Sequence, residues 1–399
     1  MAKQLHYKVV IVGGGTGGIT TAARLLRERS DLYSEVAIVD PAEKHYYQPL
    51  WTLVGGGEVA KERTERAEAS VIPDGAKWIQ EAVVELHPDD NVVITASGTE
   101  LTYDFLVVAP GIQLDWEAVK GLKENLGKNG VCSNYAYEYA ESTWDNLRNF
   151  KGGTAIFTAP NTPIKCGGAP QKIMYLAEDY FRKTGVRKAS KIVFASGGTK
   201  IFGVEKYAET LTKIVHERDI ATEFFHNLVE IDGQNRKAVF QHLQTGERVS
   251  MDYEMIHVVP PMSAPEFIKS SPLADENGWV DVDKHTLQHT KYANVFGVGD
   301  ATNLPTSKTG AAIRKQAPVL VQNLLAAMRN APGEATYNGY TSCPVITGYG
   351  KLMLAEFDYD NNPAETFPFD QGKERFSMYL LKKDMLPVIY WNGMLKGVM

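Results

Sequence analysis

Residues 8–25, K-V-V-I-V-G-G-G-T-G-G-I-T-T-A-A-R-L, constrain the fold of this chain more than any other stretch. The β-branched run at 9–12 is typical of a strand buried on both faces of a parallel sheet. Gly13, Gly15 and Gly18 follow in G-x-G-x-x-G spacing, and a helix rich in Ala and Leu is predicted over 19–26. Such glycines permit a tight turn, close approach to a pyrophosphate and packing of helix on strand. The stretch therefore predicts a phosphate-binding helix N-terminus.

A second predicted strand, at 35–39, ends in Asp40. An acid at about this distance from the glycines binds a ribose hydroxyl in dinucleotide-binding folds. The glycine spacing alone is a weak signal, and the alternative is a chance Gly-rich turn. The ordered series of strand, glycines, helix, strand and acid is much more specific, so we predict a dinucleotide site.

Composition limits the remaining possibilities. A chain of 399 residues with 44% apolar and 23% charged residues is typical of a globular protein of two to three domains. The net charge of −6 argues against a nucleic-acid partner. Only three cysteines occur, Cys132, Cys166 and Cys343, which excludes a disulfide scaffold and a C-x-x-C metal pair. The first strand begins by Lys8, and no apolar run reaches 18 residues, so we expect neither a targeting peptide nor a spanning helix.

The segment at 45–57, H-Y-Y-Q-P-L-W-T-L-V-G-G-G, is unusually aromatic and Gly-rich. Gln48 and Pro49 would present an amide and an apolar edge to a planar ring; the alternative is a packed crossover loop. Strands are predicted at 77–86, 91–95 and 105–109.

The segment at 159–172, A-P-N-T-P-I-K-C-G-G-A-P-Q-K, lies between a predicted strand at 154–158 and a helix beginning at Pro170. The next strand, at 191–195, is followed by S-G-G-T-K, which does not supply a second G-x-G-x-x-G. The sequence therefore predicts one dinucleotide-binding loop rather than two.

A late strand, V-F-G-V-G-D at 295–300, ends in Asp300 and precedes a predicted helix at 309–328. Asp300 could accept hydrogen bonds from a polyol chain, and the helix N-terminus near Lys308 directs a positive dipole to the same place. The alternative is an Asp that only caps the helix. After the opening fingerprint, we interpret this segment as the binding site of a flavin ribityl chain.

The C-terminal residues 374–399 combine aromatic and methionine side chains with lysines and an arginine. This composition suits a segment lying at a membrane surface, with aromatics at the headgroup level. The alternative is a helix packed on the body of the protein.

Taken together, several motifs resemble those of the sulfide:quinone oxidoreductases, the class that includes the mitochondrial enzymes and their bacterial relatives. The likeness runs from about residue 9 to about residue 391, and the contexts of Cys166 and Cys343 are its specific part. The motifs are residues 13–18, Y-Q-P-L-W-T-L at 47–53, C-G-G-A-P-Q-K at 166–172, residues 296–300 with 304–309, and T-S-C-P at 341–344.

The resemblance implies an α/β fold with two Rossmann-like dinucleotide-binding domains, as in disulfide-reductase-type flavoproteins, and a C-terminal membrane-facing region. The FAD-binding domain would be discontinuous, comprising residues 1–115 and 283–332. Residues 116–282 would form the second domain, without a nucleotide fingerprint, and residues 333–399 the quinone and membrane region.

The activity implied by the resemblance is oxidation of hydrogen sulfide to sulfane sulfur through a cysteine pair and FAD. A membrane quinone, ubiquinone or menaquinone, would accept the electrons, and a small thiol, sulfite or sulfide itself would accept the sulfur. By motif match Cys166 and Cys343 form the pair, within bridging reach of each other. Lys172 and Lys382 would lie near flavin and quinone, and Glu124 would serve as a base or proton relay.

We expect Cys166 to be the sulfur that attacks the flavin, because Lys165 and the following helix start would stabilise its thiolate. Cys343 would be the sulfur first struck by sulfide, because a turn before Pro344 would be open to solvent. Cys132 lies outside both motifs and is expected to be structural.

The candidate FAD-binding residues are Gly13, Gly15, Gly17, Gly18, Asp40, Gln48, Pro49, Val83, Ala109, Gly111, Asp300, Lys308, Thr309, Gly310 and Ala311. The expected partners include a membrane surface and a second copy of the chain, but no metal and no nucleic acid. Lacking a leading targeting segment, the chain is expected to be a peripheral protein of a prokaryotic cytoplasmic membrane.

Other functions are less well supported by the sequence. A pyridine-nucleotide-dependent flavin dehydrogenase needs the second glycine fingerprint that S-G-G-T-K does not supply. A flavin subunit that passes electrons to a cytochrome would be secreted, and we expect no signal peptide in this sequence. A non-enzymatic flavin redox sensor would not need both cysteines in these contexts.

Overall fold

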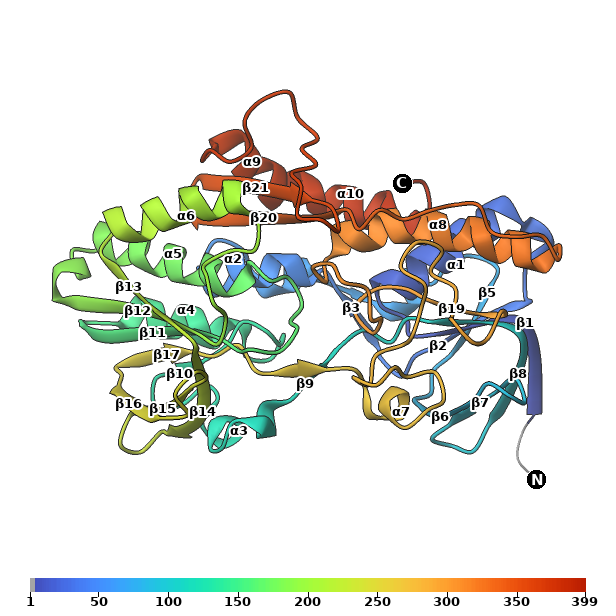
Figure 1. The fold of residues 1–399 in the computed structure, drawn as a ribbon, viewed down its shortest axis with the longest axis horizontal. Helices are drawn as coiled ribbons and strands as arrows, with labels where there is room; N and C mark the ends of the chain where they lie inside the picture. The colour runs from blue at the N-terminus through green and yellow to red at the C-terminus, as the bar shows by residue number, and fades with distance from the viewer. Residues whose placement is uncertain (1–3) are drawn as a thin grey trace.

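The computed structural model describes residues 4–399. Two α/β halves lie side by side, and the C-terminal elements extend along one side of both (Figure 1). The arrangement agrees with the predicted class, two Rossmann-like halves with an additional C-terminal region.

The first half is built on a seven-stranded sheet in the order β5-β2-β1-β8-β7-β6, with β19 paired to β8. The strands around β1 are parallel, whereas β6, β7 and β8 are antiparallel neighbours. Because β19 comes from late in the chain, this sheet is assembled from two separate segments. The strands are β1 (Gln4–Val12), β2 (Val36–Val39), β5 (Ala76–Ile79), β6 (Val83–His87), β7 (Val92–Thr95), β8 (Glu100–Val108) and β19 (Val295–Gly297).

Two helices, α1 (Thr16–Glu28) and α8 (Gly310–Met328), pack against each other beside this sheet (Figure 1). The strand predicted at 77–86 is instead two strands, β5 and β6. The reason is pairing: β5 continues the parallel sheet beside β2, whereas β6 runs antiparallel to β7, so the chain must turn between them.

The second half contains a parallel five-stranded sheet in the order β10-β17-β11-β12-β13. Its strands are β10 (Val131–Cys132), β11 (Gly153–Ala159), β12 (Ser190–Ser196), β13 (Ile220–Phe224) and β17 (Met255–His257). Its helices are α3 (Leu122–Asn125), α4 (Ala140–Asn149), α5 (Ala169–Lys183) and α6 (Glu205–Glu217). An antiparallel sheet adds β14 (His226–Asp232), β15 (Lys237–His242) and β16 (Arg248–Asp252). The pair β9 (Gln113–Leu114) and β18 (Met262–Ser263) lies where the chain passes between the halves (Figure 1).

The C-terminal region begins with a two-stranded hairpin, β20 (Thr341–Gly348) and β21 (Lys351–Phe357), which packs on α5. It continues through α9 (Phe376–Leu380), the π-helical turn η7 (Leu381–Met385), α10 (Leu386–Asn392) and η8 (Met394–Lys396). The end of the chain returns to α1, where the Arg24 guanidinium donates to the Met399 carbonyl over 3.1 Å.

The remaining elements are short. They are α2 (Trp51–Gly55), α7 (Glu266–Lys269), β3 (Lys44–Tyr46), β4 (Glu65–Ala67), η1 (Ser30–Leu32), η2 (Gln48–Leu50), η3 (Lys61–Thr64), η4 (Glu68–Ser70), η5 (Trp116–Ala118) and η6 (Arg187–Ala189). The strands of the two large sheets come from the segments assigned to the two domains, while the exact domain boundaries remain predictions. Over residues 4–399, no helix has both the length and the apolar character needed to cross a bilayer.

Candidate active site

The glycine loop between β1 and α1 is shaped by backbone contacts that exclude side chains. The run at 9–12 is buried, which fixes β1 in the centre of its sheet. Gly13 has φ +105°, a region that L residues with side chains rarely adopt. A Cβ added to Gly18 would lie 1.9 Å from the Gly13 carbonyl oxygen, so α1 can approach β1 only with glycine there.

The start of α1 is open to an anion. Gly15 is the N-cap, no side chain caps the helix within the described part of the chain, and the first turn carries no acidic residue. A Cβ built on Gly15 would meet no atom within 4 Å. Free N–H groups, a positive helix end and open space are what a pyrophosphate requires, so these residues fit a dinucleotide. Gly17 is buried in the first turn of α1.

Asp40 stands at the end of β2, as predicted, and holds the glycine loop directly. Its carboxylate accepts hydrogen bonds from Gly14 N over 2.6 Å and from Ala42 N over 2.8 Å. Ala109, which follows β8, lies against the same loop, since a Cβ on Gly13 would be 2.3 Å from the Ala109 carbonyl. Contact of Asp40 with a ribose remains a prediction.

Five of the other candidate flavin residues, Asp300, Lys308, Thr309, Gly310 and Ala311, lie at or just before the start of α8. Thr309 caps this helix by accepting a hydrogen bond from Ala312 N, and Gly310 and Ala311 form its first turn. The Lys308 ammonium donates to the carbonyls of Asp300 and Thr302 over 2.7 and 2.8 Å. Burial raises the pKa of the Asp300 carboxyl, opposed by Lys308 and Lys165. Val83 opens β6, and Gly111 has φ +78° with open space around it. The donor set at α1 and α8 fits FAD at its two ends.

The two motif cysteines, 177 residues apart in sequence, meet in the structure. Cys166 Sγ lies 3.3 Å from Cys343 Sγ, so the predicted proximity of the sulfurs is confirmed. Cys166 has φ +59°, and its N–H donates to the Lys308 carbonyl over 2.7 Å. This hydrogen bond ties the cysteine loop to the segment that leads into α8, and hence to the candidate flavin site.

The charge beside the sulfur pair comes from Lys172, not from Lys165 as the sequence suggested. Lys172 Nζ lies 3.2 Å from Cys166 Sγ, because helical side chains lean toward the N-terminus of their helix. Lys165 Nζ instead donates to Gln48 Oε1 over 2.8 Å and to the Tyr135 carbonyl over 3.0 Å. The cation predicted for Cys166 is therefore present but is supplied by α5.

The two thiols differ strongly in acidity. A hydrogen bond from the Cys343 thiol, together with the Lys172 charge, lowers the pKa of Cys166 well below that of an ordinary thiol despite its burial. The same hydrogen bond and burial raise the pKa of Cys343 well above its usual value. Burial alone would lower the pKa of Lys172, but the two sulfurs raise it. The pair is thus a Cys166 thiolate that accepts from a Cys343 thiol, beside an ammonium.

Cys343 is not in an open turn, and this sequence expectation is wrong. It lies within β20, opposite Ala355, and is 1% exposed, whereas Cys166 is half-buried. Pro344 does not mark a turn, because proline is tolerated in a strand that has a neighbour on one side only, and β20 pairs with β21 alone among the described strands. Cys166 is therefore the more solvent-accessible of the two sulfurs. Exposure does not single out Cys343 as the sulfur that sulfide attacks, so the two roles are distinguished by the acidity of the thiols.

Lys382 is brought to the same place by the π-helical turn η7. Lys382 is buried, with 2% of the residue exposed, and its ammonium donates to the Pro49 carbonyl over 2.8 Å. Burial, and next the charge of Lys172, lower the pKa of Lys382 to about 7. Gln48 and Pro49 are therefore held between Lys165 and Lys382, at the edge of the sulfur pair, which is consistent with their predicted position beside a planar ring.

Glu124 is the one candidate catalytic residue that the structure does not bring to the site. It is exposed on α3, which packs beside β14 on the opposite side of the molecule from β20 (Figure 1). Sequence position alone could not place it, because α3 is only four residues long and its docking is decided by Leu122 in a separate core cluster.

Three other contacts were missed by the sequence analysis. A Cβ on Gly168 would lie 2.5 Å from Cys343 Sγ and 3.3 Å from the Phe202 ring, so β20 can reach Cys166 only over a glycine. Phe202 comes from the S-G-G-T-K-I-F-G loop, which therefore packs against the sulfur site. The contact of Gly168 with Cys343 could have been predicted from the sequence, because Gly168 is the second glycine of the C-G-G motif.

His45 contacts both the Gly14 carbonyl (3.1 Å) and the Tyr390 hydroxyl (2.5 Å), which joins α10 to the glycine loop.

We expect the reduced enzyme to be alkylated at Cys166 by iodoacetamide with a pH midpoint below that of an ordinary thiol. Alkylation follows the thiolate fraction, and Lys172 stabilises that thiolate. Lys172→Met should move the midpoint upward, whereas Lys165→Met should leave it nearly unchanged. Peptide mass spectrometry after timed alkylation measures both. An equal upward shift in both variants would contradict the assignment of Lys172.

Known proteins that are similar to this chain include disulphide oxidoreductases, in agreement with a site that holds a cysteine pair. Residues 7–143 match the family model described as pyridine nucleotide-disulphide oxidoreductase. A solved structure, the sulfide:quinone oxidoreductase of Aquifex aeolicus, superposes with a TM-score of 0.84 at 22% identity, covering all of this chain and 92% of the other. At that identity the likeness establishes the fold.

Two curated relatives are more similar in sequence. Both are named mitochondrial sulfide:quinone oxidoreductases: that of Mus musculus is 53% identical, covering 98% of this chain and 87% of its own length, and that of Dictyostelium discoideum is 52% identical, covering 98% and 86%. The expected location at a prokaryotic cytoplasmic membrane is wrong on this comparison, because these relatives are mitochondrial proteins of eukaryotes. At more than half identity over nearly its whole length, the chain belongs to the sulfide:quinone oxidoreductase family.

Proposed function

We propose that this protein oxidises hydrogen sulfide to sulfane sulfur and passes the two electrons through FAD to a quinone. The observation that carries the proposal is the sulfur pair, 3.3 Å apart, with Lys172 on Cys166 and a backbone link to the α8 end of the dinucleotide site. Family membership supports the same reaction.

Bound FAD supplies the two-electron chemistry that links sulfide oxidation to quinone reduction. The glycine loop and the N-terminus of α1 would hold its pyrophosphate, and the segment from Asp300 to Ala311 would hold the flavin end. The backbone link from Lys308 to Cys166 N fixes the sulfur pair relative to that end. The protein's contribution is therefore to hold the reacting sulfurs and the flavin in one fixed arrangement.

The first step starts from the oxidised pair, a disulfide between Cys166 and Cys343. Hydrosulfide attacks Cys343 Sγ, the disulfide breaks, a persulfide forms on Cys343, and the electron pair leaves on Cys166 as a thiolate. The better-stabilised thiolate is the better leaving group, and Lys172 stabilises Cys166. The assignment of roles thus stays as predicted, but its reason is the charge of Lys172 rather than the exposure of Cys343.

Quinone reduction consumes two protons, and Lys382 is placed to hold one. Its pKa of about 7 means that its Nζ gains and loses a proton near neutral pH. Its position beside Lys172 and the Pro49 carbonyl keeps that proton next to the predicted ring-binding residues. We infer that Lys382 supplies a proton to the reduced quinone.

A reaction with pyridine nucleotides has little support in the site. The loop that follows β12 lacks the glycine fingerprint, and a Cβ on its Gly197 would lie 2.7 Å from Asn161 N. The same loop directs Phe202 toward Cys343. In the parallel order β13-β12-β11-β17-β10, the central strand is β11, the counterpart of β1. The loop that follows β11, P-N-T-P-I-K-C-G-G, also lacks the glycine fingerprint that a second dinucleotide would need there.

Steady-state kinetics test the proposal. Purified holoenzyme is mixed with a short-chain quinone and either sulfide or NADH, and quinone absorbance is followed. Sulfide should support reduction and NADH should not. Quinone reduction with NADH alone would favour a pyridine-nucleotide dehydrogenase, and no reduction with either would refute both functions.

The sulfur acceptor has a candidate site in a cavity of about 360 Å³ beside the cysteine loop. Its lining includes Trp279, Asn303, Ser307, Lys308 and Asn361. Ser307 Oγ accepts a hydrogen bond from Gly167 N, one residue from Cys166. The Lys308 ammonium lies over the Trp279 ring, and the lining also holds neutral polar groups and one carboxylate, Asp358. Because the ammonium is the only positive charge in this lining, we propose that sulfite or a small thiolate binds on the Lys308 side of the cavity.

Trp279 holds the Lys308 ammonium through a cation–π contact, so Trp279→Leu would leave that ammonium less well placed for the anion. We expect the KM for sulfite or thiol to rise about tenfold, which corresponds to a loss of roughly 1.4 kcal/mol. Reduction of the flavin by sulfide should be unchanged. Trp116→Leu, in η5 and packed on Tyr139, is the control. An unaltered KM for every acceptor in the Trp279 variant would exclude the cavity as the acceptor site.

Membrane attachment is proposed for the face formed by α9, η7 and α10. Phe376, Leu380, Met385 and Val388 are between 41% and 62% exposed, although they are large and apolar. Neighbouring Lys383 is turned inward to Glu58, with Nζ 2.5 Å from its carboxylate. The described residues leave this apolar face uncovered, and such a face suits the acyl boundary of a bilayer, where the quinone is found.

Replacing Phe376, Leu380 and Val388 together with Ser should weaken liposome binding by about two orders of magnitude, since each buried side chain contributes roughly 1 kcal/mol or more. Tyr33→Ser with Leu243→Ser, exposed apolar residues elsewhere, is the control. Substitution is preferable to truncation, because the tail also covers α1. Equal flotation of parent and triple variant would remove this face from the membrane proposal.

A further inference from the structure

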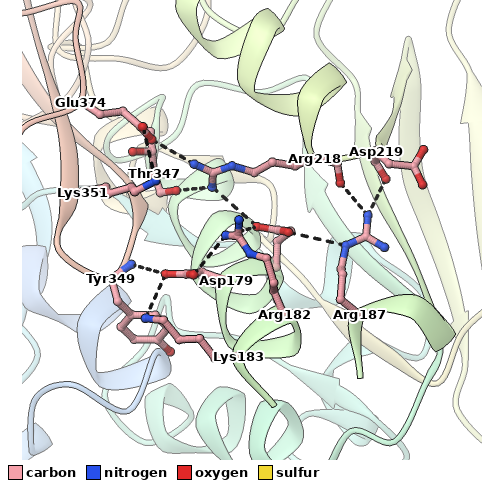
Figure 2. A network of polar contacts seen from close by, with 11 residues as sticks. Asp179, Arg182, Lys183, Arg187, Arg218, Asp219, Thr347, Tyr349, Lys351 and Glu374 are labelled. Atoms are coloured by element: carbon pink, nitrogen blue, oxygen red, sulfur yellow. Dashed lines mark hydrogen bonds and ion pairs between the residues drawn. The ribbon is translucent and has the colours of Figure 1, made fainter. Parts of the chain in front are cut away.

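A buried polar network joins the end of α5 to the far end of the Cys343 hairpin (Figure 2). Asp179 accepts a hydrogen bond from Tyr349 N, in the β20–β21 turn, over 2.8 Å. Arg218, which follows α6, donates to the Thr347 carbonyl and to Glu374 Oε1, the latter over 3.0 Å. Helices α5 and α6 therefore both hold the hairpin through polar contacts at its turn.

Glu178 stands at the centre of the network and is almost wholly buried, with 3% of its side chain exposed. Its carboxylate lies 3.1 Å from Arg182, 3.7 Å from Arg187 and 3.7 Å from Arg218. Arg187 in turn donates to the Arg218 carbonyl over 2.6 Å. A buried carboxylate that lost its ion-pair partners would be strongly destabilising, so Glu178 holds these arginines in one arrangement. In this arrangement the Arg218 guanidinium reaches the hairpin.

Helix α5 and strand β20 pack along each other, with the sulfur pair at one end of this contact and the polar network at the other. At the reacting end, Gly168, the N-cap of α5, lies against Cys343 Sγ, since a Cβ built on this glycine would be 2.5 Å from that sulfur. At the other end, Asp179 reaches Gly348 and Tyr349. Within residues 4–399, β20 and β21 form a sheet of two strands only, so the position of the hairpin along α5 depends on how it docks.

We propose that Asp179 and Arg218 are positioning residues for the sulfur pair: they fix the hairpin along α5 so that Cys343 Sγ stays within bonding reach of Cys166 Sγ. A disulfide forms only within a narrow range of geometry, so a small slide of β20 lowers the effective concentration of one thiol at the other. The proposal rests on the proposed function, in which these two cysteines react together.

The test is the reduction potential of the cysteine pair in the holoenzyme, without sulfide or quinone. Samples are equilibrated anaerobically in mixtures of reduced and oxidised dithiothreitol. Each reduced dithiothreitol gives two electrons and two protons to the disulfide and closes to its own cyclic disulfide. After acid quenching, maleimide labelling and peptide mass spectrometry give the fraction of Cys166 and Cys343 present as thiols.

In Arg218→Gln and Asp179→Ala we expect the effective concentration to fall at least tenfold, which raises the potential by about 30 mV. Arg182→Gln is the matched control. Arg182 pairs with the same Glu178 and Asp179, but among the described residues it has no polar contact with the hairpin, and its side chain is half exposed. It should keep the parental potential. Asp179→Asn, which retains an acceptor for Tyr349 N, should recover most of the loss.

Parental potentials in both Arg218→Gln and Asp179→Ala would overturn the proposal, as would an equal shift in Arg182→Gln. Thermal unfolding is measured on the same samples, with Arg218→Lys as a milder variant should Arg218→Gln fail to fold. A merely structural role lowers stability without moving the potential. Failure of the proposed function is separate, since it would appear as absent sulfide turnover in a parent whose cysteine pair titrates normally.

Discussion

Replacing either Cys166 or Cys343 with Ser should lower sulfide-dependent quinone reduction by about 10³-fold or more, with each single variant as impaired as the double. A serine hydroxyl cannot form the disulfide that hydrosulfide attacks, so neither partner has a residual function without the other. The sulfurs touch at 3.3 Å, and no other cysteine in the described chain is near enough to replace them.

Cys132→Ser is the matched control. Cys132 is fully buried in β10, where its thiol donates to the Ile256 carbonyl, and burial raises its pKa to about 12. Turnover should remain within a few-fold of the parent. Quinone reduction and the FAD content of each variant are measured together, so that loss of chemistry is distinguished from loss of cofactor. Near-parental turnover in both Cys166→Ser and Cys343→Ser would contradict the mechanism.

Gly18→Ala and Gly15→Ala should fail in different ways. The added methyl of Gly18→Ala would overlap the Gly13 carbonyl at 1.9 Å, so α1 must move off β1, at a cost of about 3 kcal/mol or more. The protein should unfold at lower temperature and be purified with little FAD. The added methyl of Gly15→Ala meets no protein atom within 4 Å. Its apoprotein should be as stable as the parent.

The Gly15→Ala variant should nevertheless bind FAD about 10- to 100-fold more weakly, because its methyl group would occupy the space of the pyrophosphate. Apoprotein melting and FAD titration separate the two effects. Unchanged FAD affinity in Gly15→Ala would mean that the pyrophosphate does not approach this loop.

The sequence predicted those features that local chemistry determines. The glycine spacing required a strand, a tight turn and a helix, and β1 and α1 provide them around Gly13. The helix predicted at 309–328 begins at Gly310 with Thr309 as its cap, because a Thr side chain can accept the free N–H of the first turn. The meeting of Cys166 and Cys343 was expected from the resemblance of their motifs, not from spacing.

Features that depend on tertiary docking were not predictable in this way. Lys165 is next to Cys166 in sequence, but its ammonium turns to Gln48, whereas Lys172, about one turn into α5, leans back to the sulfur. Pro344 suggested a turn, yet pairing with β21 keeps this segment extended. The positions of Glu124 and of the Arg218 network depend on which surfaces pack together, which no local pattern records.

In the proposed mechanism, sulfide delivers electrons to the flavin through the cysteine pair. It is tested most directly by mixing the yellow holoenzyme anaerobically with one equivalent of sulfide, following flavin absorbance, and then adding quinone. We expect bleaching by sulfide in the parent, recovery of colour with quinone, and no bleaching in Cys343→Ser or with NADH in place of sulfide. Bleaching of the Cys343→Ser variant by sulfide as fast as the parent, or bleaching of the parent by NADH alone, would contradict it.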